Sequence, residues 1–166
     1  MQINKKISFL SVANEPYIPI VSSLLKSASE HHPDIKFNLV IVNTSEESNK
    51  KLKSLHPNLN LIKANAPEDK NKKLQGRLNL AFGQHCPIEQ WYCMACRTWF
   101  MSSLMNPEEL GIFYMDADVV IGGKIDKLFN FFKNSDIMVR AKDASQKNFK
   151  CNVGMVWIKN SKKMLD

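Results

Sequence analysis

The sequence lacks the long apolar runs and processing signals that would place a chain in a membrane or in a secretory pathway. No run approaches the roughly 18 apolar residues that cross a bilayer, and residues 7–12 are too short and too strand-like for the core of a signal peptide. Internal repeats, low-complexity tracts and clear linkers are also missing. We therefore expect a cytoplasmic protein with a single domain over residues 1–166.

Cysteine is scarce, and only one pair has a spacing that suggests chemistry. The four cysteines are Cys86, Cys93, Cys96 and Cys151, and in a cytoplasmic protein they are expected to be reduced. Cys93 and Cys96 have the Cys-x-x-Cys spacing of zinc and redox sites, but they fall within a predicted helix and no second such pair follows. We interpret them as small buried residues.

Acidic residues are fewer than basic ones, which favours an anionic partner. The chain has 23 Lys and Arg against 16 Asp and Glu, a net charge of +7. That excess fits a nucleotide diphosphate, an anionic membrane surface or nucleic acid. No glycine-aromatic signature of nucleic-acid binding interleaves with the basic residues, so nucleic acid is not expected. The residues available for peripheral contact with the inner face of a membrane are Lys50, Lys51, Lys53, Lys70, Lys72, Lys73, Lys159, Lys162 and Lys163.

Apolar runs alternate with segments of helical periodicity along the chain. Strands are expected at residues 7–12, 37–42, 59–62, 112–115, 136–141 and 151–158. Helices are expected at residues 18–30, 46–55, 88–105 and 125–132. This alternation is typical of an α/β fold with a doubly wound, mostly parallel sheet flanked by helices. Ligands bind such sheets at the carboxyl ends of the strands.

The most informative segment is residues 111–129, GIFYMDADVVIGGKIDKLF. Its apolar run ends in Asp116 and Asp118, which are separated by the small Ala117. Residues two apart in a strand share one face, so the carboxylates are expected to project together from a strand end. Carboxylates this close repel unless a cation lies between them, and Mg²⁺ or Mn²⁺ suits such oxygen ligands. Capping or surface carboxylates are the alternative, and the glycines at residues 122–123 predict a tight turn.

Two further candidate site regions are the end of the first strand and a charged residue among apolar neighbours in a predicted helix. Asn14 follows the first strand and precedes Pro16 and Tyr17, at the edge where a ligand would bind. Arg97 lies among apolar residues of the predicted helix 88–105. A cation in such surroundings needs a partner, either a carboxylate or a phosphate.

The last two predicted strands add three more candidates. Asp143 comes just past the end of residues 136–141, and Asn152 and Gly154 lie within residues 151–158. A glycine inside a strand often marks the close approach of a ligand or another backbone.

Taken in order, these features resemble the GT-A fold glycosyltransferases, and most closely glycosyltransferase family 8. That family includes lipopolysaccharide galactosyl- and glucosyltransferases and glycogenin. Residues 13–17 (ANEPY) are similar to its Ala-Asp-x-x-Tyr turn, residues 113–120 (FYMDADVV) to its Leu-Tyr-Leu-Asp-x-Asp pattern, and residues 152–155 (NVGM) to its Asn-x-Gly-Val strand. Arg97 occupies the place of an arginine on the helix before the metal strand. The likeness covers nearly the whole chain.

The resemblance implies a role for each of these residues. Asn14 and Tyr17 would hold the nucleotide base, the first by a hydrogen bond and the second by stacking. Arg97 would lie near the donor sugar or the diphosphate. Asp116 and Asp118 would bind Mn²⁺ (or Mg²⁺), which bridges the diphosphate of a UDP-sugar such as UDP-glucose or UDP-galactose.

The remaining residues of the implied site are Ala117, Asp143 and Asn152. Ala117 belongs to the cofactor-binding segment, whereas Asp143 and Asn152 would act as catalytic residues that contact the donor sugar or frame the acceptor. The implied activity is metal-dependent transfer of a hexose from a UDP-sugar to a glycan or lipid-linked acceptor, with retention. A nucleotide-sugar-binding module without turnover is the alternative.

Two features depart from the family's pattern. Asn14 stands where many members have Asp, which keeps hydrogen bonding but removes a charge. The chain also ends about where the family's acceptor half begins, and that half normally supplies a late histidine ligand for the metal. The four histidines, which all precede the Asp pair, are His31, His32, His56 and His85. We therefore expect the nucleotide-binding half of the family's fold.

Overall fold

The computed structural model describes residues 7–68, 76–79, 86–141 and 151–160 of the chain. Six strands form one sheet in the order β3-β2-β1-β4-β6-β5. They are β1 (Ile7–Asn14), β2 (Lys36–Val42), β3 (Leu59–Ala64), β4 (Gly111–Met115), β5 (Ile137–Ala141) and β6 (Cys151–Lys159). The apolar runs of the sequence therefore correspond to the strands, and the predicted α/β class is confirmed.

The direction of β6 makes the sheet parallel from β3 to β4 and antiparallel from β4 to β5. β1 pairs in parallel with β2 and β4, and β2 with β3, whereas β6 is antiparallel to both β4 and β5. The sheet is mostly parallel, as predicted. Because β6 runs in reverse, its early residues lie at the edge where the parallel strands end. Met155 pairs with Met115 there, and the amide of Asp116 donates to the carbonyl of Gly154 at 2.7 Å.

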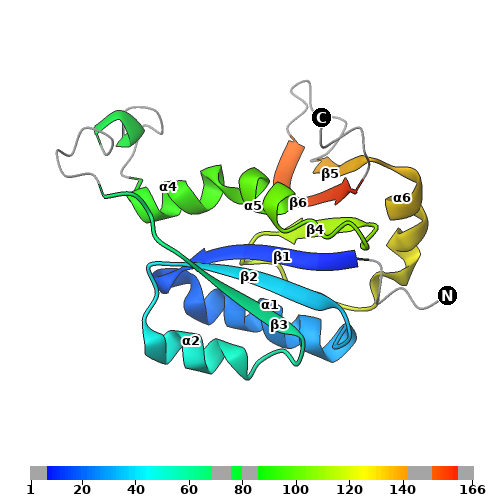
Figure 1. Ribbon diagram of the computed structural model, residues 1–166, viewed down its shortest axis with the longest axis horizontal. Coiled ribbons are helices and arrows are strands. Elements are labelled where there is room, and N and C mark those ends of the chain that lie inside the picture. The colour runs from blue at the N-terminus through cyan, green and yellow to red at the C-terminus, as the bar shows by residue number, and fades with distance from the viewer. Residues whose placement is uncertain (1–6, 69–75, 80–85, 142–150, 161–166) are drawn as a thin grey trace.

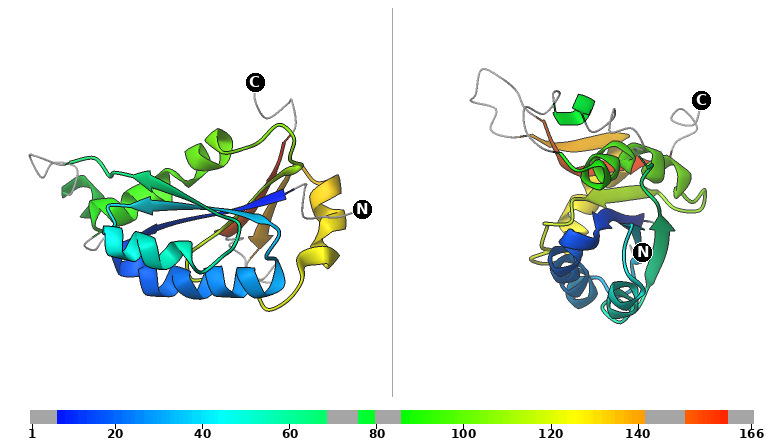
Figure 2. Two further views of the ribbon diagram at one scale, coloured as in Figure 1. Left: turned by 60° about the horizontal axis from the view of Figure 1, so that its bottom comes forward. Right: turned by 90° about the vertical axis from the view of Figure 1, so that its left-hand side faces the viewer.

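Helices cover both faces of the sheet (Figures 1 and 2). They are η2 (Glu15–Tyr17), α1 (Ile18–His31), α2 (Glu46–Lys53), α4 (Ile88–Ala95), α5 (Arg97–Ser103), η3 (Ile125–Leu128) and α6 (Phe129–Asn134). α1 and α2 lie on one face, α4 and α5 lie on the other, and α6 packs against β6. Within the described part of the chain, no helix is both long and apolar enough to cross a bilayer.

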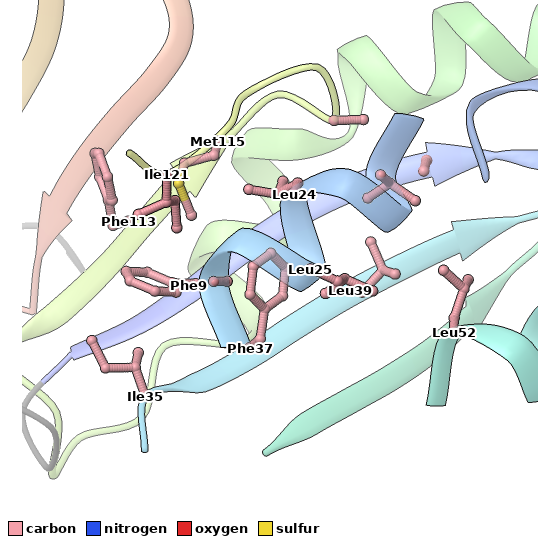
Figure 3. Packing of buried hydrophobic residues seen from close by; sticks show 14 of the residues in the cluster. Phe9, Leu24, Leu25, Ile35, Phe37, Leu39, Leu52, Phe113, Met115 and Ile121 are labelled. Atoms are coloured by element: carbon pink, nitrogen blue, oxygen red, sulfur yellow. The ribbon is translucent and has the colours of Figure 1, made fainter. Parts of the chain in front are cut away.

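Alternation along the strands divides the buried side chains between two cores. Phe9, Phe37 and Phe113 come from three neighbouring strands and belong to the core on the face that α1 covers (Figure 3). Their ring centroids are 5.9 Å apart for Phe9 and Phe37, and 6.3 Å apart for Phe9 and Phe113. Tyr114, one residue further along β4, points to the other face and packs with Phe100 of α5. This second core supports the site.

Gly111 permits the close pairing of β4 with β6. A Cβ atom at this position would lie 2.2 Å from the carbonyl oxygen of Ile158 and 2.6 Å from the indole ring of Trp157. Trp157 is fully buried and stacks on Phe132 of α6, with ring centroids 4.6 Å apart. This packing holds the start of β4 against β6, and β4 ends one residue before Asp116.

The predicted helix over residues 88–105 is divided into α4 and α5. Cys96 separates them, with φ −86° and ψ −3°. Hydrogen bonds from the amide of Cys96 to Tyr92 and from the amide of Phe100 to Cys96, each 2.9 Å, continue across the bend. The segment contains neither proline nor glycine, so the sequence carries no signal for the bend. The break makes Arg97 the first residue of α5.

Candidate functional site

Two adjoining cavities open at the edge of the sheet where β1, β2 and β4 end. We call them the Asp116 cavity, of about 270 Å³, and the Asn43 cavity, of about 390 Å³. The Asp116 cavity is lined by Val12, Ala13, Asn14, Tyr17, Gln90, Cys93, Met94, Arg97, Tyr114, Asp116, Ala117, Asp118 and Gly154. The Asn43 cavity is lined by Asn14, Glu15, Pro16, Tyr17, Val42, Asn43, Pro87, Glu89 and Gln90. Asn14, Tyr17 and Gln90 therefore form a shared wall.

A turn, rather than the pleat of a strand, brings the two carboxylates to the Asp116 cavity. β4 ends at Met115, and the amide of Val119 donates to the carbonyl of Asp116 at 3.1 Å. The expectation that Asp116 and Asp118 extend one strand face is therefore wrong, although both side chains line the same cavity. At residues 122–123, where a tight turn was expected, the chain has an irregular residue followed by a bend at Gly123, and neither glycine has a left-handed φ.

Asp116 is held by two neighbours through the same oxygen atom. The hydroxyl of Tyr114 donates to its Oδ1 at 2.6 Å, and Nη1 of Arg97 lies 3.5 Å from Oδ1. The guanidinium carbon of Arg97 lies 5.8 Å from the centroid of the Tyr114 ring. Burial, followed by the charge of Asp116, raises the pKa of Tyr114 well above its usual range, so its hydroxyl remains a donor. The partner that Arg97 was expected to need is thus a carboxylate.

The two carboxylates form a donor set that suits a hard divalent cation. Asp118 is exposed and Asp116 half-buried, while Ala117 between them is buried. Mg²⁺ is often held by one or two carboxylates, with phosphate and water oxygens as the other ligands. Across the described ranges, no three His, Cys, Asp or Glu side chains gather to hold a metal ion. Within these ranges the chain offers a cation two carboxylates, and phosphate or water oxygens would complete its coordination.

The opposite wall of the Asp116 cavity is set by the chain just after β1. Asn14 is buried, with 7% of its surface exposed. Glu15 accepts hydrogen bonds from the amide of Ser45 at 2.8 Å, from the Ser45 hydroxyl at 3.1 Å and from the Ser48 hydroxyl at 2.6 Å. The Ser48 hydroxyl, followed by the Ser45 amide, lowers the pKa of Glu15. This carboxylate ties η2, and with it Tyr17, to the start of α2.

The sequence analysis missed Asn43, which lies at the same sheet edge. Asn43 follows β2 directly and has a left-handed φ of 52°. Its amide donates to the carbonyl of Ala64 at 3.1 Å, and its Oδ1 accepts from the amide of Ala66 at 3.2 Å. Asn43 lies one residue past an apolar run, as Asn14 lies at the end of β1. This position in the sequence could have identified Asn43 as a candidate site residue.

Gln90 and Cys93 were also missed as cavity residues. Both lie on α4 and line the Asp116 cavity together with Met94 and Arg97. The spacing from Gln90 through Cys93 to Arg97 follows one helical face, which continues across the bend. Burial raises the pKa of the Cys93 thiol to about 12, so it faces the cavity as a neutral group. Cys93 and Cys96, both predicted to be buried, are each half-buried.

The segment that follows Asp118 is anchored to α1. The amide of Ile121 donates to the hydroxyl of Ser27 at 3.0 Å, and the amide of Ile125 donates to Nε2 of His32 at 3.1 Å. The same Nε2 lies 3.3 Å from the carbonyl oxygen of Gly123. Burial, opposed mainly by that carbonyl, lowers the pKa of His32, which favours the neutral ring that can accept from Ile125.

The structure does not describe the side chains of the two residues predicted to be catalytic, Asp143 and Asn152. Asp143 lies outside the described residues. Asn152 belongs to β6, opposite Arg140 of β5, but only its backbone is described. Their roles stay predictions.

Glycosyl transferase family 8 matches the chain over residues 9–163. No curated protein sequence matches it. Among solved structures, the chain is similar to the galactosyltransferase LgtC in complex with donor and acceptor sugar analogues, with 15% identity and a TM-score of 0.51 over 91% of this chain and 57% of that chain. It is also similar to the glycosyltransferase GlyE of Streptococcus pneumoniae TIGR4, with 17% identity and a TM-score of 0.56 over 95% and 35% of the two chains. A third similar structure is mouse xyloside xylosyltransferase 1, with 14% identity and a TM-score of 0.56 over 92% of this chain and 67% of that chain.

At these identities the solved structures show the fold, and the predicted GT-A type is confirmed. The chain spans 57% of the length of LgtC and 35% of that of GlyE. The family match extends over almost all of the sequence, and the chain belongs to glycosyl transferase family 8.

Proposed function

We propose that the chain is a metal-dependent glycosyltransferase that binds a UDP-sugar with Mn²⁺ or Mg²⁺. It transfers the hexose to a hydroxyl group of a glycan or lipid-linked acceptor, with retention. The observation that carries this proposal is that Asn14, Tyr17, Arg97, Asp116 and Asp118 line a single cavity at the carboxyl edge of the sheet. The family match and the positive net charge of +7 support an anionic donor.

The nucleoside binds where the two cavities share a wall. Asn14 offers a buried amide that can both donate to and accept from a base. Tyr17 supplies an aromatic ring for stacking beside it. The Asn43 cavity adds room next to this wall for the rest of the nucleoside.

The diphosphate and the sugar bind toward Arg97, Asp116 and Asp118. The two carboxylates hold the cation, which supplies Lewis-acid stabilisation of the diphosphate charge when bound. During transfer the bond between the anomeric carbon and the diphosphate oxygen breaks, and its electron pair stays on that oxygen. The acceptor oxygen bonds to the anomeric carbon, and its proton passes to the departing diphosphate oxygen. Asp143 and Asn152 are the residues we propose to contact the donor sugar or frame the acceptor.

Contact of the chain with an anionic membrane surface is a further part of the proposal. Lys50, Lys51 and Lys53 lie exposed on α2 and are available for it. Such contact would bring a lipid-linked acceptor close to the site.

A donor panel tests the proposal directly. UDP release would be measured from UDP-glucose, UDP-galactose and related UDP-sugars with Mn²⁺, with and without an acceptor, alongside the melting temperature with UDP and Mn²⁺. We expect UDP with Mn²⁺ to raise the melting temperature and at least one donor to release UDP. Binding without any release would favour the alternative of a binding module without turnover.

The double variant Asp116→Asn, Asp118→Asn is the informative control for both readouts. It keeps the size of each side chain, and it should abolish the stabilisation by UDP with Mn²⁺ and the release of UDP. Asp126→Asn removes an exposed carboxylate of η3 outside the cavity and should change neither. If the unmutated chain is not stabilised by UDP with Mn²⁺, the proposed function is wrong.

A further inference from the structure

The carboxylate of Asp116 has a cationic partner within the chain. Nη1 of Arg97 lies 3.5 Å from Oδ1 of Asp116, and the two side chains keep 22% and 40% of their surface exposed. A tight charge-assisted hydrogen bond between such groups measures about 2.7–2.9 Å. The pair is therefore close enough to neutralise Asp116 but is not locked by a short hydrogen bond.

Arg97 has a second support that does not depend on Asp116. Its guanidinium carbon lies 5.8 Å from the centroid of the Tyr114 ring, a cation–π distance. Tyr114 is itself buried and holds Oδ1 of Asp116 through its hydroxyl at 2.6 Å. Tyr114 thus contacts both members of the ion pair, and Arg97 also lines the cavity.

We propose that Arg97 is an internal counter-ion that exchanges partners, neutralising Asp116 in the free protein and turning to the diphosphate when metal and nucleotide bind. The proposal rests on the proposed function of the cavity. A divalent cation beside Asp116 is repelled by the guanidinium as long as Arg97 stays in its present position. The diphosphate offers Arg97 another anionic partner, for which the guanidinium fork is well suited.

The exchange makes the binding of the cation and of the diphosphate mutually favourable. Each ligand removes part of the cost that the other would meet alone, and such coupling is reciprocal by thermodynamic necessity. A nucleoside without phosphates gives Arg97 no new partner, so it should not assist the cation. The proposal therefore predicts that UDP, but not uridine, increases the affinity for Mn²⁺ through Arg97.

The test is the affinity for Mn²⁺, measured from the electron paramagnetic resonance signal of the free ion. It would be determined for the unmutated chain and for Arg97→Gln, each alone, with uridine and with UDP. We expect Arg97→Gln to bind Mn²⁺ alone about five- to tenfold more tightly, in the usual range of coupling between sites. UDP should then raise the Mn²⁺ affinity of this variant less than that of the unmutated chain.

Two further variants separate partner exchange from other effects. Lys124→Gln removes the same charge from an exposed position outside the cavity and should leave Mn²⁺ binding unchanged. Arg97→Lys keeps the charge and should bind Mn²⁺ alone as weakly as the unmutated chain. If Arg97→Lys and Arg97→Gln bind Mn²⁺ equally well, the charge is not responsible and the proposal is wrong.

The outcomes for the unmutated chain distinguish this proposal from the proposed function. If UDP tightens Mn²⁺ binding there but Arg97→Gln binds Mn²⁺ alone no more tightly, the counter-ion role is wrong and the proposed function stands. If UDP does not affect Mn²⁺ binding in the unmutated chain, both are wrong. Circular dichroism of each variant would verify that it is folded, and Arg97→Met, which also removes the charge, replaces Arg97→Gln in the comparison if Arg97→Gln is not folded.

Discussion

The two ends of the Asp116 cavity are built in different ways. At the β1 end, the wall is the neutral, buried Asn14 together with Tyr17, and Glu15 ties this segment to α2 through three hydrogen bonds. At the β4 end, the wall is Asp116 with its partner Arg97, followed by an exposed Asp118. The β1 end is fixed by hydrogen bonds within the fold, whereas the β4 end combines the hydrogen bond from Tyr114 with the ion pair between Asp116 and Arg97.

If the proposed function is right, this difference separates recognition of the nucleoside at the β1 end from chemistry at the diphosphate at the β4 end. A neutral, buried wall can be complementary to a base before any ligand arrives, which lowers the cost of binding. A charged wall must give up one set of partners to gain another. The β1 end should therefore bind a nucleoside with little dependence on metal, whereas the β4 end should respond to the cation and the diphosphate together.

The largest effect is expected from Asp118→Asn at the β4 end. The change removes one of the two carboxylates, and because Asp118 is exposed it should leave the fold intact. Affinity for UDP in the presence of Mn²⁺ should fall by at least about tenfold, as is usual when a metal site is damaged. Affinity for uridine should stay within about twofold of the original, since the nucleoside carries no diphosphate. Isothermal titration calorimetry with both ligands would measure this.

Asn14→Leu is the matched change at the β1 end. It replaces a buried amide by an apolar group of similar size. If Asn14 binds the base as proposed, loss of its hydrogen bonds should weaken the binding of uridine and of UDP to a similar extent, by about tenfold, the equivalent of 1–2 kcal/mol. If Asp118→Asn weakens uridine as strongly as UDP, the two ends do not act separately and the comparison fails.

The sequence was sufficient for most of the fold. Apolar runs located β1, β2 and β4, and the spacing of Val21, Leu24 and Leu25 located α1, because these residues are buried in the core. The same runs could not give the direction of β6, since an apolar strand reads alike in either direction. That reversal nonetheless puts Gly154 at the cavity.

The site was harder to predict than the fold because its geometry depends on contacts between distant segments. The residue types at Asp116 and Asp118 were informative, but the turn that positions them was not predicted. Arg97 was expected to need an anion, yet only the bend at Cys96 and the packing of α5 on β4 bring it to Asp116. Asn43 and Gln90 carry no charge and belong to no motif, so they were missed.

The next effect is expected from Glu15→Gln, which tests how firmly the β1 end is held. The neutral amide accepts weaker hydrogen bonds from Ser45 and Ser48, so η2 and Tyr17 should be less well positioned. We expect uridine affinity to fall a few-fold at neutral pH. Glu47→Gln removes the same charge from the first turn of α2 and should leave uridine affinity unchanged. Equal effects of the two variants would show that charge, rather than the tie to α2, matters.

Glu15 also predicts a pH dependence at the β1 end. Its pKa is lowered in the folded chain, chiefly by the Ser48 hydroxyl. Its stabilising contribution is therefore present above its ordinary pKa and is lost as the pH falls through the lower, folded pKa. Uridine binding by the unmutated chain should weaken only in that acid range, whereas Glu15→Gln should show no such loss.

The smallest effect concerns His32, which anchors the segment behind the β4 end. Burial lowers its pKa, so the unfolded chain binds a proton there before the folded chain does. Stability from this residue is present above its ordinary pKa near 6.5 and is lost as the pH falls below it, by at most about 1.4 kcal/mol per pH unit. His56 has a pKa lowered by burial as well, so His32→Gln should reduce the slope of stability against pH without abolishing it.

Hydrogen exchange would locate this loss on the molecule. A protonated Nε2 of His32 can donate to the carbonyl of Gly123 but can no longer accept from the amide of Ile125, so that amide should lose protection as the pH falls from about 7 to about 5. The amide of Ile121 donates to the hydroxyl of Ser27, which does not titrate, and it should keep its protection after correction for the intrinsic rate. Parallel loss at both amides would mean that the segment opens as a whole. Loss at Ile125 alone would mean that the β4 end is loosened by one proton, while the β1 end, which has no such histidine contact among the described residues, stays as it was.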